Sequence, residues 1–182
     1  MNTVLLANLI KIRWIAIIGQ LITLFIIFFV FNFNIPLTEC FVVVFLSILV
    51  NCSSYFIQKG NSTLTDKKTF LFLTFDISQL ICLLFLTGGV FNPFVILILA
   101  PIIISASYLP ALWTILLALY SILLILIINF NYIPLNWEQN FITPFIYNIG
   151  ILVALIITII FISIYAYLFA SSARKISSAL SE

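Results

Sequence analysis

Long runs of Ile, Leu, Phe and Val dominate this chain, and its charged residues are too few to cover a surface that faces water. Charged side chains make up 7% of the 182 residues, whereas soluble domains carry about 25%. The chain therefore has to be dissolved in lipid. In a bilayer only helices or a closed barrel pair every backbone polar group. Because the runs lack the alternation of barrel strands, the sequence predicts an all-α, polytopic membrane protein.

Six apolar segments are candidates for membrane-spanning helices: 14–31, 40–57, 70–87, 94–107, 111–129 and 145–169. A crossing needs about 20 residues. The fourth segment is short and would need flanking apolar residues, whereas the sixth is long enough to tilt or to leave the membrane as a helix. Turn-forming Gly, Pro and Asn residues stand in most of the breaks. We therefore expect about six transmembrane helices.

The basic residues predict the orientation of these spans. With six spans, all seven fall on one side of the membrane: Lys11, Arg13, Lys59, Lys67, Lys68, Arg174 and Lys175. The loops on the other side carry only Glu39 and Glu138. By the positive-inside rule the basic side is cytoplasmic, so the N and C termini are both expected in the cytoplasm. A five-span arrangement would place Arg174 and Lys175 outside, which argues against it.

The residue inventory excludes several kinds of chemistry. The chain has no histidine, which removes His-based catalysis, His metal ligation and phosphohistidine chemistry from this chain. No P-loop and no kinase-type Gly-rich loop for ATP is present. The spacing of Cys40, Cys52 and Cys82 matches no metal motif, so we interpret them as small apolar residues. We expect no catalytic residue, no metal site and no nucleic-acid partner.

A short polar and aromatic segment, Thr87-Gly88-Gly89-Val90-Phe91-Asn92-Pro93-Phe94, separates the third and fourth apolar runs. Most of it suits a plain helix connector. Gly88 can end the third helix with a positive φ. Asn92 can cap the next helix, and Pro93 suits its first position.

A connector does not explain the two phenylalanines of this segment. Phe91 and Phe94 would place aromatic rings beside a helix N-terminus at the predicted outer interface. Free backbone N–H groups at such an end favour electron-rich oxygens. Two rings and amide donors would suit a flat quinone that enters sideways from the lipid. The segment is therefore either a connector or a ligand site.

Asp76 is the one clear acid within a predicted span. A carboxylate in lipid costs about 2.5–3.5 kcal/mol on insertion scales, and such residues often serve a function. Gln79 follows three residues later, on the same helix face. Asp76 and Gln79 are therefore candidates for signalling or proton handling. The alternative is structural, with both side chains making hydrogen bonds between helices.

The turn resembles the Gly-Gly-x-x-Asn-Pro-Phe ubiquinone motif of the RegB/PrrB/ActS redox-sensing histidine kinases. Further runs resemble the same family: Ile12 to Gln20, Leu64-Thr65, Phe75 to Leu80, Leu83 to Gly89 and Ile98 to Pro101. The resemblance covers about residues 10–105. The last two spans are similar to the family only in hydropathy and order.

The resemblance implies a sensor part with six spans and cytoplasmic termini in the inner membrane of a bacterium. It implies ubiquinone as the sensed ligand, at a site that carries over to Gly88, Gly89, Asn92, Pro93 and Phe94. Phe91 occupies a variable position of the motif, and we add it to the site from its place in the turn. The family also implies two-component phosphorelay signalling, a homodimer, and a response regulator reached through a kinase core.

The expected domain organisation follows from the same resemblance. Residues 1–170 would form the membrane sensor, and 171–182 the start of a cytoplasmic linker helix. In that linker Ile176 and Leu180 have coiled-coil spacing. The phosphoacceptor histidine and the ATP-binding domain of the family have no counterpart here, so the chain is not expected to phosphorylate itself. We interpret it as a truncated product, a split sensor or a fragment.

Two other functions remain open from the sequence. One is a small membrane transporter or permease subunit that uses Asp76, which predicts flux in liposomes and a strong effect of Asp76→Asn. The other is a decayed remnant without activity. The sensor interpretation predicts no flux, and sensitivity to substitution at Asn92 and Phe94.

Overall fold

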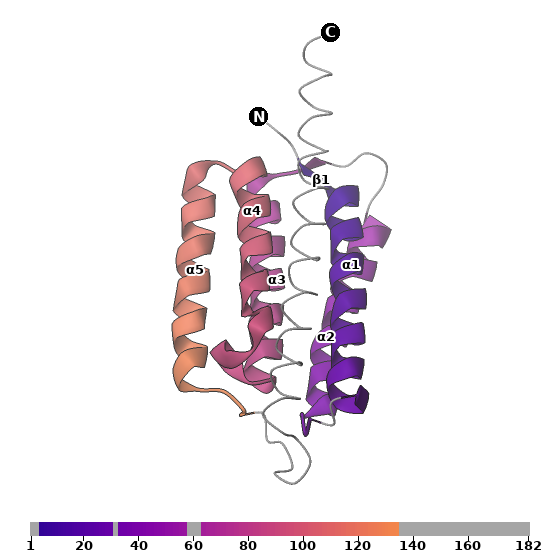
Figure 1. The fold of residues 1–182 in the computed structure, drawn as a ribbon. Coiled ribbons are helices and arrows are strands. Elements are labelled where there is room, and N and C mark those ends of the chain that lie inside the picture. Colours follow the sequence, from indigo (N-terminus) through magenta and orange to yellow (C-terminus); the bar gives the residue numbers. More distant parts are fainter. Residues whose placement is uncertain (1–3, 31–32, 58–62, 135–182) are drawn as a thin grey trace.

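A computed structural model describes residues 4–30, 33–57 and 63–134 of the chain. Consecutive helices run up and down in alternation and form an all-helical bundle (Figure 1). Within the described residues, four helices are long and apolar enough to cross a membrane, and a shorter apolar helix covers Pro93–Tyr108. The sixth predicted span, 145–169, and the predicted linker, 171–182, lie outside the described residues.

The described helices are α1 (Leu6–Phe25), α2 (Leu37–Ile57), α3 (Asp66–Leu86), α4 (Leu99–Tyr108) and α5 (Ala111–Phe130). The shorter helical elements are the π-helix η1 (Ile26–Val30), which continues α1, and the 3₁₀ helices η2 (Gly89–Phe91) and η3 (Pro93–Ile98). Two short strands, β1 (Val4–Leu5) and β2 (Thr63–Leu64), pair antiparallel. The predicted all-helical class is confirmed, with this strand pair as a small addition.

The predicted start of the first span is wrong. We predicted a span from residue 14, but α1 begins at Leu6 and contains Arg13 within its length. The sequence predicts that Arg13 lies before the span, because a basic residue usually flanks a membrane-spanning helix rather than standing inside it. Arg13 is 5% exposed, and it is tolerated inside the bundle because α3 supplies its partner. The helices of the second and third spans also begin three to four residues before the predicted starts.

The fourth segment gains length from its 3₁₀ turn. Six residues of η3 at about 2.0 Å each and ten of α4 at about 1.5 Å each give about 27 Å. The same residues in a continuous α-helix would span about 24 Å. The hydrocarbon core is about 30 Å thick. The 3₁₀ turn therefore brings a short segment close to the length of a full crossing.

The strand pair joins the N-terminal ends of α1 and α3. Val4 pairs with Leu64, directly before the two helices begin. The exposed Lys11, Lys67 and Lys68 lie in the first two turns of these helices and therefore gather at one end of the bundle. This end of the described bundle is thus basic.

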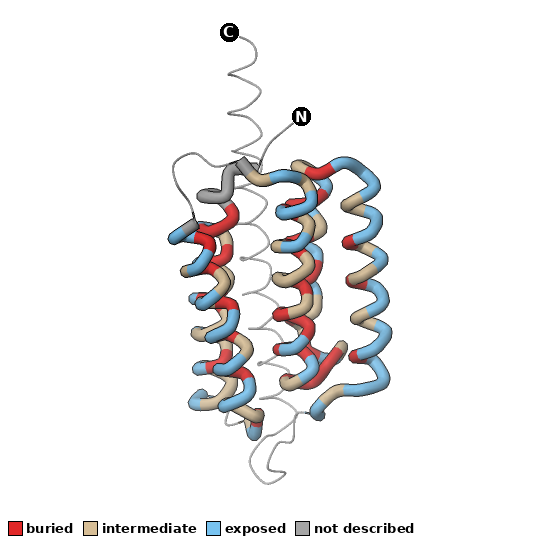
Figure 2. The backbone as a smooth tube through the Cα atoms, turned by 180° about the vertical axis from the view of Figure 1, so that it is seen from behind, coloured by how far each residue is buried: buried red, intermediate tan, exposed pale blue. Residues whose placement is uncertain are grey.

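Buried residues face the inside of the bundle and exposed residues face outward along each helix (Figure 2). α3 is the central helix, because it packs against α2, α4 and α5. One apolar cluster joins α3 to α4 and α5, and a second joins α1 to α2 and to Leu83 of α3. The outer face of α5 exposes large apolar side chains: Leu112, Ile115, Leu119, Ile122, Leu123 and Leu126. Such a face suits lipid rather than water.

Candidate functional site

The turn between α3 and α4 stops one helix and starts the next, as its residues predict. Gly88 has φ 103° and Gly89 has φ 64°, both in the left-handed region that glycine occupies at low cost. Space adds a second constraint at Gly89. A Cβ there would lie 2.7 Å from Cγ of Tyr132. Gly88 is therefore fixed by conformation, and Gly89 by conformation and close packing.

The segment that follows α5 fastens this turn to α3. The backbone N–H of Gly88 donates to the carbonyl of Ile133 at 3.1 Å, and the N–H of Ile133 donates to the carbonyl of Phe85 at 2.8 Å. The ring of Tyr132 lies beside Phe91, with ring centroids 5.8 Å apart. The turn is thus clamped between the end of α3 and the chain after α5.

Asn92 closes the turn with its whole side-chain amide. Its Nδ2 donates to the carbonyl oxygen and to the hydroxyl of Thr87, each at 2.9 Å. Its Oδ1 accepts from the N–H of Phe94 at 3.0 Å, which is the predicted N-cap, and Pro93 takes the predicted first position. An amide has two N–H donors, and both are used within the turn. Asn92 therefore shapes the turn.

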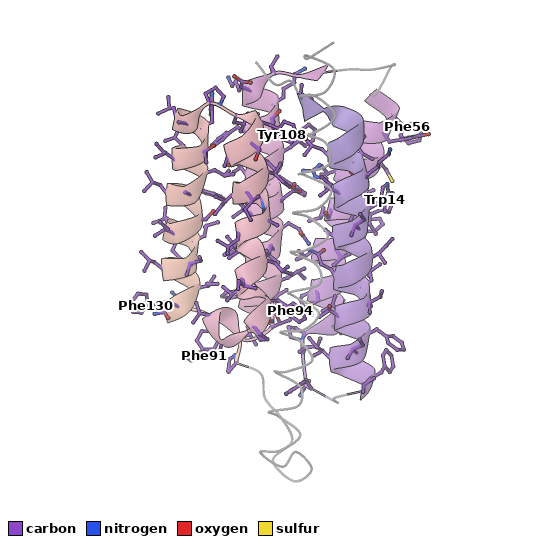
Figure 3. All side chains as sticks on the ribbon, turned by 45° about the horizontal axis from the view of Figure 1, so that its top comes forward. Trp14, Phe56, Phe91, Phe94, Tyr108 and Phe130 are labelled. Atoms are coloured by element: carbon purple, nitrogen blue, oxygen red, sulfur yellow. The ribbon has the colours of Figure 1, made fainter. Side chains whose placement is uncertain are left out.

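The two phenylalanines of the turn lie in different surroundings (Figure 3). Phe91 is 71% exposed, whereas Phe94 is 9% exposed. Phe94 lines a cavity beside the turn, and Phe91 is not among the residues that line it. The two rings therefore do not form one clamp, although both belong to the predicted site.

The cavity lies between α1, α3 and the η3–α4 segment, and its volume is about 120 Å³. Small residues form much of the α1 wall: Ala16, Gly19 and Thr23. Leu97 and Pro101 line the opposite wall from η3 and α4. The lining is mainly apolar, with a few polar side chains. Such a composition is typical of small-molecule sites.

An ion pair lies in this cavity, on the side away from the turn. Nη2 of Arg13 lies 2.8 Å from Oδ1 of Asp76, and Nε donates to Oδ2 at 3.1 Å. Nη2 also donates to the carbonyl of Phe72 at 2.9 Å. The guanidinium lies over the rings of Phe72 and Phe75, at 4.7 and 5.5 Å from their centroids. This bidentate geometry is the strong form of an Arg–carboxylate contact.

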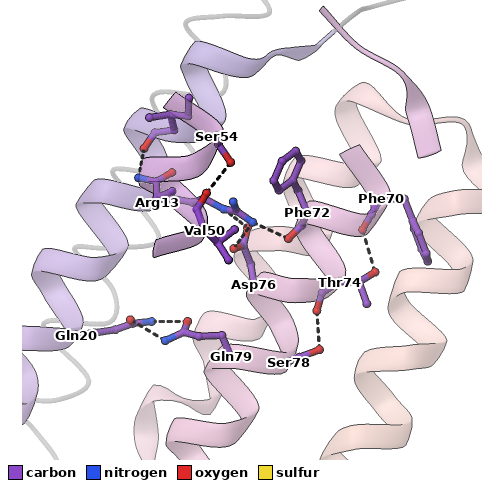
Figure 4. A network of polar contacts seen from close by, with 12 residues as sticks. Arg13, Gln20, Val50, Ser54, Phe70, Phe72, Thr74, Asp76, Ser78 and Gln79 are labelled. Atoms are coloured by element: carbon purple, nitrogen blue, oxygen red, sulfur yellow. Dashed lines mark hydrogen bonds and ion pairs between the residues drawn. The ribbon is translucent and has the colours of Figure 1, made fainter. Parts of the chain in front are cut away.

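A second polar contact joins α1 to α3 below the ion pair (Figure 4). The amides of Gln20 and Gln79 donate to each other, with N···O distances of 3.1 and 3.0 Å. Gln79 is 8% exposed. Each amide supplies one donor and one acceptor for the other in a setting where water is scarce.

The structure thus brings only part of the predicted site together. Asp76, Gln79, Asn92 and Phe94 line one cavity. The other predicted residues do not line it: Gly88, Gly89, Phe91 and Pro93. The first three of these build the turn or pack on its outer side, and Pro93 starts η3.

Arg13 and Gln20, the partners of Asp76 and Gln79 in this cavity, were not predicted as site residues. They are seven residues apart, which is two helical turns, so they share one face of α1. Two polar residues on one face of an apolar helix could have indicated a polar contact with another helix. Asp76 and Gln79 likewise share one face of α3. The pairing of the two helices was not readable from either pattern alone.

Two of the three cysteines, Cys40 and Cys52, lie on α2, and Cys82 lies on α3. Cys40, Cys52 and Cys82 form no disulfide with one another. Within the described residues, no cluster of three or more His, Cys, Asp or Glu side chains has the geometry to hold a metal ion.

Breaking the ion pair from one side should cost more than removing both partners. Arg13→Leu or Asp76→Leu leaves a buried polar group without its partner, so each should lower the free energy of unfolding by about 1–3 kcal/mol. The double variant should lose less than the sum of the two. Denaturation in detergent micelles, followed by circular dichroism, measures this. Lys11→Leu is the control, because Lys11 is exposed, and additive losses would contradict the pairing.

Gly89→Ala should destabilise the turn. The added Cβ meets the Tyr132 ring and the residue must keep a positive φ, so we expect a loss of about 1–3 kcal/mol. Tyr132→Gly in the same chain should restore part of that loss, because it removes the Cβ, Cγ and Cδ1 atoms that the added Cβ of residue 89 meets. Thermal unfolding of the single and double variants measures the effect. Equal stability of Gly89→Ala and the unsubstituted protein would contradict the packing described here.

The chain is 34% identical over 177 residues to the sensor histidine kinase RegB of Cereibacter sphaeroides, which covers 96% of this chain and 38% of that protein. A RegB sequence from a named strain of the same species is 35% identical over 75 residues, or 41% of this chain and 16% of the relative. No protein-family model and no solved structure matches the chain.

The chain therefore spans well under half the length of the curated relatives it matches. The longer match runs through nearly all of this chain. It thus includes α1, the turn, the cavity and α5. Apolar helices of membrane-spanning length are also present. The chain is a RegB-type sensor region.

Proposed function

We propose that this sensor region binds ubiquinone at the Gly-Gly-Val-Phe-Asn-Pro-Phe turn and thereby regulates a two-component histidine kinase. The observation that carries the proposal is the cavity beside that turn. Phe94 supplies an aromatic wall, and the cavity is mainly apolar with a few polar groups. A planar ring with carbonyl oxygens needs such an environment.

The motif residues have distinct tasks in this proposal. Gly88 and Gly89 allow the tight turn, and Asn92 locks it. Pro93 then starts η3, which directs Phe94 into the cavity. The ubiquinone ring packs against Phe94, while Asn92 acts on the ligand only through the shape of the turn.

The proposed membrane arrangement has six crossings in the inner membrane of a bacterium, with both termini in the cytoplasm. The basic end formed by the start of α1 and of α3 supports it, because cytoplasmic loops are rich in Lys and Arg. The alternation of the described helices supports it as well. In this arrangement the turn lies toward the outer surface, at the end of the bundle opposite the lysines.

Signal transfer requires that ubiquinone binds two states of the sensor with different affinity. Bound ubiquinone would bias the positions of α3 and η3–α4. The 145–169 segment would carry that bias to a cytoplasmic helix and on to a kinase core, in a homodimer that serves a response regulator. The RegB relatives are sensor histidine kinases, which supports this two-component setting.

The transport alternative depends on a free Asp76. In the structure both carboxylate oxygens of Asp76 contact Arg13, which favours a structural task for this acid. Flux assays in liposomes with Asp76→Asn separate the two functions. The sensor proposal expects no flux from either protein.

Phe94→Ala should weaken ubiquinone binding about tenfold, which corresponds to about 1.4 kcal/mol, because the ring loses its aromatic wall. The measurement is a titration of the protein in nanodiscs with decylubiquinone, followed by Trp fluorescence. Phe91→Ala is the matched control, since Phe91 belongs to the same turn but does not line the cavity. It should bind as the unsubstituted protein does.

The outcomes separate three cases. Absence of saturable binding by the unsubstituted protein contradicts the proposed function. Loss of binding in Phe91→Ala with full binding in Phe94→Ala places ubiquinone on the outer surface of the turn. Equal binding by all three proteins contradicts a role for the turn.

A further inference from the structure

The facing amides of Gln20 and Gln79 retain hydrogen-bonding capacity. Each side-chain amide has two N–H donors and a carbonyl oxygen with two acceptor positions. Their mutual contact uses one donor and one acceptor position of each. Within the described residues, one N–H and one acceptor position therefore remain on each amide, and both residues line the cavity.

The amide pair lies deep in the bundle, far from the turn. Gln79 lies eight residues before Thr87 on α3, which is about 12 Å along the helix axis. The pair is therefore well inside the apolar part of the bundle. Where water is scarce, an unused amide N–H is unfavourable, and a ligand acceptor that reaches it is favoured.

The walls around the pair leave room for a ring. Gly19 and Thr23 are small residues of α1 on either side of Gln20 in the sequence, and both line the cavity. The cavity volume of about 120 Å³ is close to the volume of about 150 Å³ that holds benzene in an engineered protein cavity. A bare six-membered ring about fills this space, so the methoxy and methyl groups of a ubiquinone ring must lie toward the open side of the cavity.

We propose that the ubiquinone ring enters this cavity past Phe94 and accepts a hydrogen bond, through one of its carbonyl oxygens, from an unused N–H of the Gln20–Gln79 amide pair. The inference rests on the proposed function and adds the polar contacts that the turn itself does not offer, since the amide of Asn92 is used within the turn. The isoprenoid tail leaves through the open side of the cavity.

This location has a consequence for signalling. Gln20 belongs to α1 and Gln79 to α3 (Figure 4). A ring bound to this amide pair lies in a cavity lined by α1, α3 and Phe94 of η3. Binding therefore changes the contact between α1 and α3, in addition to the contact between α3 and η3.

The competing explanation is that the pair serves only to hold two helices together. A matched contact exists on another side of α3, where Ser78 and Tyr120 of α5 share a hydrogen bond of 2.7 Å. Neither Ser78 nor Tyr120 lines the cavity. Removing that contact also loosens an interhelical link, but it leaves the proposed ligand contacts in place.

The experiment compares two ligands on three proteins in nanodiscs. The ligands are decylubiquinone and an analogue with the same substituents on a benzene ring without the carbonyl oxygens. The proteins are the unsubstituted chain, Gln20→Met/Gln79→Met, and the control Ser78→Ala/Tyr120→Phe. Met has nearly the length of Gln and adapts to its surroundings, so the cavity keeps its shape. Gln20→Leu/Gln79→Leu serves as the second variant if the first does not fold.

The readout is the ratio of the two dissociation constants, which is insensitive to a general loss of binding-competent protein. We expect decylubiquinone to bind the unsubstituted chain and the control about tenfold tighter than the analogue. In the Gln-to-Met variant the two ligands should bind equally. Saturable decylubiquinone binding with an unchanged ratio in that variant overturns the inference and leaves the proposed function standing. Absence of saturable binding by the unsubstituted chain overturns both.

Discussion

The ion pair between Arg13 and Asp76 is the constraint on which the rest of the bundle depends. A single charge inside a membrane is costly, and each of these residues makes the other acceptable. The contact is bidentate, and Arg13 also donates to the carbonyl of Phe72. It therefore sets the position of α1 relative to α3 along the helix axis. The amide pair of Gln20 and Gln79 repeats the link farther along. Long polar side chains bridge the two helices here, and the small residues of α1 beside them leave the cavity open.

The turn and the cavity have complementary tasks. The glycines allow the tight turn, the amide of Asn92 makes hydrogen bonds within it, and Pro93 starts η3. Together they set the direction in which η3 leaves the turn. The 3₁₀ winding of η3 both directs Phe94 inward and lengthens a segment that would otherwise be short for a crossing. The same residues therefore serve the fold and the proposed ligand site. A helix connector and a binding motif, which looked like alternatives in the sequence, are compatible in the structure.

Local chemistry determines what could be predicted from the sequence. Apolar runs predict helices, and cap residues such as Gly88, Asn92 and Pro93 act within a few positions of themselves, so the described helices and the turn matched expectation closely. The partners of Asp76 and Gln79 lie 63 and 59 residues away on α1. No local pattern reports such a pairing. The same distant contact explains the wrong start of the first span, because Arg13 is inside the bundle only by virtue of its partner. Whether Phe91 or Phe94 faces a cavity likewise depends on the packing of α1 and the chain after α5.

Photolabelling with an azido-substituted ubiquinone tests most directly the claim that the cavity between α1, α3 and η3–α4 holds the ligand. The labelled peptides of the chain in nanodiscs are identified by mass spectrometry, with and without excess decylubiquinone. The account predicts labels near Gly19–Thr23 on α1 and near Leu97–Pro101, and it predicts that decylubiquinone removes them. Labels confined to the lipid-facing side of α5, or labels that decylubiquinone does not remove, would contradict it.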